Sequence, residues 1–133
     1  MIYMLNTNIC SYIIRNRPES VKEKLKEVER LHQVALSSIV VSELLYGAYR
    51  KGSYKLIEAV KCFISGFVVY DFDSKAAEEY ALLRTEIERK GAVIGAYDLQ
   101  IAAHARSLPA VLVTNNEKEF LRVEGLRVEN WIK

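Results

Sequence analysis

Short and long apolar patterns alternate along the chain. Four short runs rich in apolar and β-branched residues cover residues 1–5, 34–38, 67–72 and 110–114. Each run is followed by a longer segment in which apolar residues recur every three or four positions, as on one face of a helix. This alternation is typical of a parallel sheet covered by helices. It predicts a three-layer α/β domain with a short, mainly parallel sheet flanked by helices.

Helices are predicted wherever the apolar period is three to four residues. They cover residues 7–16, 19–31, 39–52, 53–66, 74–90 and 94–108. Ser53 and Gly66 are suited to cap the fourth of these helices, and Pro18 is tolerated in the first turn of the second. A tight turn or short helix over residues 115–120 and an edge strand over residues 126–130 complete the prediction.

The apolar faces of two helices indicate which side chains enter the core. In the second helix this face comprises Val21, Leu25 and Val28. In the helix over residues 74–90 it comprises Ala77, Tyr80, Ala81, Leu83 or Arg84, and Ile87. The lysines and glutamates that alternate along residues 19–31 are typical of a solvated face rather than of a binding patch.

The composition is that of one folded domain, which we expect to span residues 1–133. Half of the residues are apolar, and the formal charge of +2 permits a nucleic-acid partner without requiring one. Two cysteines do not form a disulfide framework, so we expect reduced thiols and a cytoplasmic location. No segment has the roughly 18 to 20 apolar residues of a membrane span, and the first residues lack the features of a signal peptide.

Polar residues stand where the predicted strands end. Asn6 follows the first strand, Glu43 and Asp98 stand near the starts of helices, and Asn116 follows the fourth strand, with Glu119 one turn later. Each has a local alternative, because acids favour the positive end of a helix and asparagine is a common turn residue. Ligands of open parallel sheets bind beyond the carboxyl ends of the strands, so we expect these side chains to converge on one rim.

Four stretches in this order give the chain a family resemblance. "MLNTN", "VSELLYGA", "IGAYDLQIAAHA" and "VLVTNNEKEF" resemble the successive motifs of PIN-domain ribonucleases. The chain is most similar to VapC toxins of type II toxin–antitoxin systems, within them to the tRNA(fMet)-specific endonucleases. The resemblance extends from Met1 to the "GLRVENW" near the end of the sequence.

The first motif departs from the family pattern at one position. The family has Leu-Asp-Thr-Asn, whereas this sequence has an asparagine, Asn6, where a metal-binding aspartate is expected. Glu43 and Asp98 match the second and third acidic positions, and Asn116 matches a position that varies between Asp and Asn. The resemblance implies a Mg²⁺ site, with Mn²⁺ as the alternative. In it Asp98 is a direct ligand, Glu43 a ligand or water-orienting base, and Asn116 and Glu119 lie around them.

The resemblance also implies partners. These are an RNA substrate, namely initiator tRNA cleaved in its anticodon stem-loop, and a VapB-type antitoxin. It further implies a toxin homodimer, a higher toxin–antitoxin assembly, and contact with operator DNA only through the antitoxin. Because Asn6 lacks the charge of aspartate, we expect a catalytically impaired endoribonuclease.

Three other interpretations remain open from the sequence. A thiol enzyme would use Cys10 with His32 or His104. A phosphoacceptor signalling domain would use Asp71, although the acid pair and the lysine that such domains need are not evident. A catalytically silent partner of an antitoxin would keep its surfaces while Asn6 weakens the chemistry, and the helix faces near Tyr46, Tyr49, Tyr54 and Phe63 are candidate interfaces.

Overall fold

A computed structural model describes residues 1–132 of the chain as one α/β fold. Five strands form a single sheet in the order β3-β2-β1-β4-β5, and all four pairs of neighbours are parallel. The strands are β1 Ile2–Leu5, β2 Gln33–Ser37, β3 Val68–Tyr70, β4 Val111–Val113 and β5 Arg127–Glu129. The predicted edge strand near the end of the chain is confirmed as β5.

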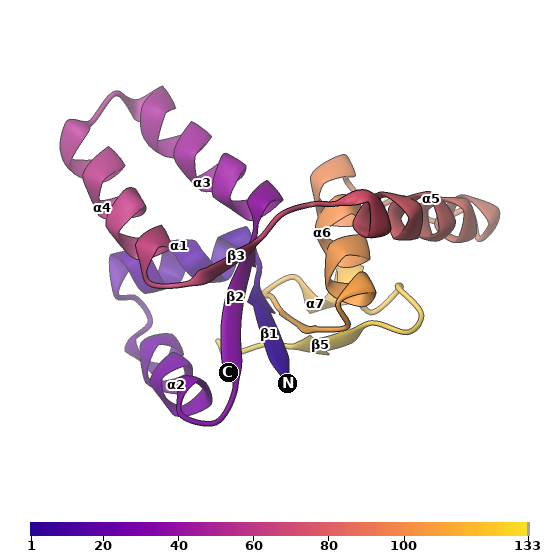
Figure 1. Cartoon of the computed structure of the whole chain (residues 1–133), viewed down its shortest axis with the longest axis horizontal. Coiled ribbons are helices and arrows are strands. Elements are labelled where there is room, and N and C mark those ends of the chain that lie inside the picture. The colour runs from indigo at the N-terminus through magenta and orange to yellow at the C-terminus, as the bar shows by residue number, and fades with distance from the viewer. Residues whose placement is uncertain (133) are drawn as a thin grey trace.

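Seven helices in the described part of the chain connect and cover these strands. They are α1 Thr7–Arg15, α2 Glu19–Glu29, α3 Ser38–Lys51, α4 Tyr54–Ser65, α5 Ser74–Arg89, α6 Ala96–Ser107 and α7 Glu117–Phe120. In Figure 1, β1 and β2 stand in the middle, with α1 to α4 on one side and α5 and α6 on the other. The predicted α/β architecture is confirmed.

The register of the sheet brings three strand ends to one edge. Met4 of β1 is paired with Ala35 of β2 on one side and with Leu112 of β4 on the other. Since all three strands run in the same direction, the residues that follow them emerge together at the carboxyl edge of the sheet. These residues are the starts of α1 and α3 and the connection between β4 and α7.

The core lies around the central strands. Met4, Leu5, Leu36 and Leu112 are fully buried, as expected for strands covered by helices on both faces. Three alanines of α6, Ala102, Ala103 and Ala105, are also buried and allow this helix to approach its neighbours closely. No helix within residues 1–132 is long and apolar enough to cross a membrane.

The predicted caps of α4 are confirmed. The Ser53 hydroxyl accepts a hydrogen bond from the Leu56 N–H at 3.2 Å, and Gly66 ends the helix. Pro18 was predicted to stand in the first turn of α2. It instead occupies the extended position just before the helix. The buried face of α2, formed by Val21, Leu25 and Val28, is confirmed.

The predicted core face of α5 is wrong at two positions. Ala77 and Ala81 are exposed, whereas Ala76, Leu83 and Ile87 are buried. Burying an alanine removes little apolar surface from water, so adjacent alanines do not decide which face turns inward. The larger side chains, Leu83 and Ile87, set the orientation of the helix.

The candidate interface residues on α3 and α4 lie largely outside the core. Tyr46, Tyr49 and Tyr54 are exposed, and Phe63 is half-buried. Core packing therefore does not explain the three tyrosines.

Candidate functional site

Asn6 joins the end of β1 to the start of α1. Its side-chain oxygen accepts a hydrogen bond from the Thr7 N–H at 2.8 Å, which caps the helix, and its side-chain nitrogen donates to the Thr114 hydroxyl at 3.0 Å. The residue is buried, with 3% of its surface exposed. Since the Thr7 N–H requires an acceptor, the amide oxygen faces the helix and the amide nitrogen faces Thr114.

Thr114 links this point to the loop after β4. Its buried hydroxyl also accepts from the Asn116 N–H at 3.0 Å, and the Asn116 side-chain nitrogen donates to Glu119. The other carboxylate oxygen of Glu119 accepts from the Gly95 N–H at 3.2 Å, at the start of α6. Hydrogen bonds thus connect the ends of β1 and β4 to the beginning of α6.

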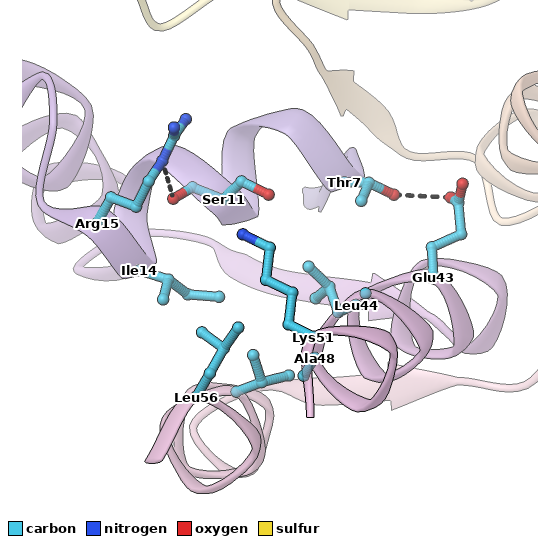
Figure 2. Close-up of a pocket in the computed structure, with 11 residues that line it drawn as sticks. Thr7, Ser11, Ile14, Arg15, Glu43, Leu44, Ala48, Lys51 and Leu56 are labelled. Carbon is cyan, nitrogen blue, oxygen red and sulfur yellow. Dashed lines mark hydrogen bonds between the residues drawn. The ribbon is translucent and has the colours of Figure 1, made fainter. Parts of the chain in front are cut away.

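Glu43 points from α3 toward the first turn of α1. The Thr7 hydroxyl donates to its carboxylate at 2.7 Å, and the side chain is half-buried (Figure 2). The alternative that Glu43 serves the positive end of a helix is wrong, because α3 begins at Ser38 and is capped by Ser37. The orientation of Glu43 is set by Thr7.

Asp98 is the most strongly perturbed acid of the group. It lies in the first turn of α6, and burial together with the negative charges of Glu119 and Glu43 raises the pKa of its carboxyl group to about 6. The Asp98 carboxylate is therefore partly removed from water and is repelled by the charges of Glu119 and Glu43. Asp98 also stabilises the positive end of α6, because it lies in the first turn of that helix. This local role is compatible with a role in the site.

The donor atoms of this region fit a hard divalent cation. Asp98, Glu43 and Glu119 offer carboxylate oxygens, and the excess negative charge around Asp98 is the condition that such a cation relieves. Among residues 1–132, however, no three His, Cys, Asp or Glu side chains lie close enough to hold a metal ion by themselves. Mg²⁺ binds proteins through one or two carboxylates and keeps several of its waters, so Asp98 and Glu43 would hold it only together with water.

The structure therefore brings together all five residues predicted from the sequence. Asn6, Asn116 and Glu119 are joined through Thr114, and Glu43 and Asp98 are close enough to interact electrostatically. Two residues that hold this arrangement were not predicted, namely Thr7 and Thr114. Both stand inside the quoted motifs, so the signal was present, but a threonine hydroxyl has no acid–base chemistry that singles it out.

The geometry disfavours two of the alternative interpretations. Cys10 is fully buried in the core, and burial raises the pKa of its thiol. His104 is 1% exposed and is held by a 2.8 Å hydrogen bond between its Nδ1 and the Ser37 hydroxyl. The thiol and the imidazole are thus packed as core groups. Asp71, the acceptor in the phosphoacceptor interpretation, follows β3. This strand lies at the edge of the sheet, and β2 separates it from β1, so Asp71 does not follow a central strand.

A groove opens beside the acidic residues, between α1, α3 and α4. Its volume is about 350 Å³. Thr7 and Glu43 stand at one end and Arg15 at the other, while Lys51 reaches into the groove between them and aliphatic side chains line its walls (Figure 2). The groove therefore has an acidic end at the candidate site and a basic end away from it.

Comparison with known proteins gives consistent results. Residues 3–126 match the PIN domain family. The chain is 44% identical to ribonuclease VapC2 of Rickettsia felis, with 100% of both chains covered, and 40% identical to the tRNA(fMet)-specific endonuclease VapC of Salmonella typhimurium, with 97% of both covered. A crystal structure of VapBC2 from Rickettsia felis bound to a DNA fragment from its promoter gives a TM-score of 0.93 at 44% identity. That match covers 98% of this chain and 99% of the other.

Proposed function

The chain belongs to the PIN-domain family and to the VapC ribonucleases within it, and from this premise we propose that it is the toxin of a VapBC toxin–antitoxin pair. In this proposal it is a Mg²⁺-dependent endoribonuclease whose catalysis is impaired by Asn6. The observation that carries the proposal is the meeting of Asp98, Glu43 and Glu119 at the carboxyl edge of the sheet.

Asp98 and Glu43 are the residues proposed to hold the cation, with Mn²⁺ as a possible substitute for Mg²⁺. When bound, the ion lowers the pKa of a coordinated water and neutralises charge that develops on the phosphate. Glu43, oriented by the Thr7 hydroxyl, is suited to accept a proton from water. Asn116 and Glu119 hold the loop after β4 against α6 and so fix the position of Asp98.

Asn6 weakens this site in two ways. It has no negative charge, and a unit charge pair about 4 Å apart is worth roughly 4 kcal/mol at an effective dielectric constant near 20, or about twice that for a divalent ion before screening. In addition, one lone pair of its only side-chain oxygen is occupied by the Thr7 N–H, while its nitrogen faces Thr114. An aspartate in the same place would offer a charged second oxygen.

The substrate and partners follow from the relatives. The relative from Salmonella typhimurium is named for tRNA(fMet), and we propose that this chain cleaves initiator tRNA in its anticodon stem-loop. We also propose a VapB-type antitoxin that places a guanidinium or ammonium group against Glu43 and Asp98, where two repelling carboxylates favour a cation. A homodimer and contact with operator DNA through the antitoxin belong to the same proposal.

A nuclease assay tests this function. The chain and its Asn6→Asp variant are compared on initiator tRNA in Mg²⁺, Mn²⁺ and EDTA, with the doubly substituted Asn6→Asp/Asp98→Asn chain as the matched control. We expect the single variant to cleave at least tenfold faster than the chain and the control to be inactive. Equal cleavage by the chain and the single variant would show that position 6 does not bind the metal.

A second candidate function is a silent binding partner of the antitoxin. Asn6 favours it, because the substitution weakens the metal site while the groove between α1, α3 and α4 is retained. The same assay separates the two functions. A chain that binds antitoxin tightly, and whose Asn6→Asp variant cleaves no RNA, is a binding protein.

A further inference from the structure

Arg15 and Arg17 stand at the end of α1, and Lys51 at the end of α3 reaches into the groove beside this helix; we call these three residues the basic end of the groove. Arg15 and Lys51 line the groove itself, and Arg15 and Arg17 line an adjoining hollow together with Tyr12 and Pro18. Figure 2 shows the Lys51 ammonium group crossing the groove toward Ser11 of α1, with Arg15 one turn farther along the same helix. Arg15 thus connects the groove to the outer surface of the molecule.

Arg15 is held in place by neutral contacts. Its Nε donates to the Ser11 carbonyl at 3.3 Å, and its guanidinium carbon lies 5.2 Å from the centre of the Tyr12 ring. The Tyr12 hydroxyl in turn accepts from the side-chain nitrogen of Asn115, which adjoins Asn116 of the candidate site. The position of this guanidinium is therefore coupled to the loop that follows β4.

The charges of these three residues are not neutralised within the described chain. Over residues 1–132, none of Arg15, Arg17 and Lys51 forms an ion pair with a carboxylate, whereas Arg106 contacts both Glu79 and Glu86. Such unneutralised cations on an accessible surface attract anions of the surrounding solution.

The basic end lies at a distance from the acidic site that suits a nucleic-acid strand. Helix α1 begins at Thr7, which contacts Glu43, and ends at Arg15. A helix of this length spans about 12 Å. One strand of nucleic acid advances about 3.4 Å per phosphate when stacked, so this distance covers roughly three to four nucleotides. A substrate that enters an acidic site also needs cations nearby, because the carboxylates repel its phosphates.

We propose that Arg15, Arg17 and Lys51 form a phosphate-binding site that holds the RNA strand a few nucleotides from the cleavage position. The site rests on the proposed ribonuclease function and adds to it a way of positioning the substrate. The hollow beyond the groove suits RNA, since two arginines and no carboxylate line it and its apolar lining consists of Pro18 and the ring of Tyr12, on which a base can stack.

RNA binding without chemistry tests the proposal. The probe is a fluorescein-labelled single-stranded oligouridylate, and its binding to the chain in EDTA is measured by anisotropy over a series of salt concentrations. We expect Arg15→Gln/Lys51→Gln to bind about tenfold more weakly. Each lost phosphate contact reduces the slope of log K against log salt by about 0.7 for a single strand, so the expected decrease is about 1.4.

Matched controls separate position from total charge. Lys55→Gln/Lys75→Gln removes the same charge from exposed side chains outside both hollows and should bind like the chain. Arg15→Lys/Lys51→Arg keeps the charge and should retain most of the affinity. Circular dichroism and urea unfolding of each variant establish that the fold is retained.

Several outcomes would overturn the proposal. These are an equal loss in the Lys55/Lys75 control, unchanged binding by the Arg15/Lys51 variant, and no measurable RNA binding at low salt. If the Arg15/Lys51 variant loses affinity for the antitoxin but not for RNA, the basic end serves the protein partner instead. Because no cleavage is measured, failure here is independent of whether Asn6→Asp restores the nuclease.

Discussion

The side-chain nitrogen of Asn6 donates a 3.0 Å hydrogen bond to the hydroxyl of Thr114, and so joins the ends of the neighbouring strands β1 and β4. Both residues are buried, and this hydroxyl also accepts from the Asn116 N–H. An aspartate at position 6 has no N–H to donate, so the Thr114 hydroxyl would donate to the carboxylate instead. The same pair of residues therefore suits either side chain by reversing the direction of one hydrogen bond.

Replacing Thr114 with valine tests how much this hydroxyl contributes. The change leaves the Asn6 side-chain donor and the Asn116 N–H without their acceptor, and a buried unsatisfied polar group costs about 1–3 kcal/mol. We expect urea unfolding to show a loss of that size. Thr85→Val is the control, because the Thr85 hydroxyl is exposed and bonds only to a carbonyl of its own helix, and it should change stability by less than about 0.5 kcal/mol.

Much of the fold was predictable because two independent signals coincided. The apolar period located six of the seven helices of the described chain, and local chemistry marked ends such as Ser53 and Gly66. The prediction failed in α5, where alanines at positions 76, 77 and 81 are compatible with more than one inward face. Small side chains follow the packing of larger neighbours, which a single sequence does not reveal.

The candidate site was predictable for a different reason. Parallel strands place their carboxyl ends together, so residues far apart in sequence, such as Asn6 and Asn116, could be assigned to one edge. The hydrogen bonds of Thr7 to Glu43 and of Glu119 to the start of α6 could not be predicted, because they depend on side-chain directions across elements. The basic end of the groove was missed for the same reason.

Asp98→Asn should change the pH dependence of stability. The pKa of Asp98 is about 6 in the folded protein, above the ordinary value of 3.8, so its carboxyl group contributes stability below pH 4 that is lost as the pH rises through 6. We expect the variant to gain about 1–2 kcal/mol relative to the chain between pH 4 and pH 7, after discounting for partial exposure. Urea titrations across this range measure the difference. Glu58→Gln, an exposed change on α4, should leave the profile unchanged.

Glu119→Gln should move the pKa of Asp98 toward its ordinary value. The charge of Glu119 is one cause of the raised pKa, after burial, whereas the glutamine oxygen can still accept from the Gly95 N–H. NMR titration of the Asp98 carboxyl group would report a lower midpoint in the variant. A midpoint that stays near 6 would leave burial and the charge of Glu43 as the causes and would place Glu119 electrostatically outside the site.

His104 should produce the opposite pH effect. Burial lowers its pKa below the ordinary value of 6.5, while Asp73 and Asp71 act in the opposite direction. A group whose folded pKa is lowered contributes stability above pH 6.5 that is lost as the pH falls through the folded value. In His104→Gln this loss should be absent. Urea unfolding of the chain and the variant between pH 7 and pH 5 compares the two slopes, and parallel slopes would contradict the prediction.

Restoring an aspartate at position 6 should make the fold depend on divalent cations. In Asn6→Asp a further carboxylate joins Asp98, Glu43 and Glu119, so without metal the added repulsion should lower stability at pH 7 and raise the pKa of Asp98 further. A bound cation reverses this, and a ligand at ten times its dissociation constant stabilises a protein by about 1.4 kcal/mol. We therefore expect Mg²⁺ or Mn²⁺ to raise the melting temperature of Asn6→Asp and EDTA to reverse the rise.

The chain itself should respond little, and adding Asp98→Asn to the variant should abolish the response. A chain stabilised by Mg²⁺ as strongly as its Asn6→Asp variant would mean that the charge missing at position 6 does not limit metal binding.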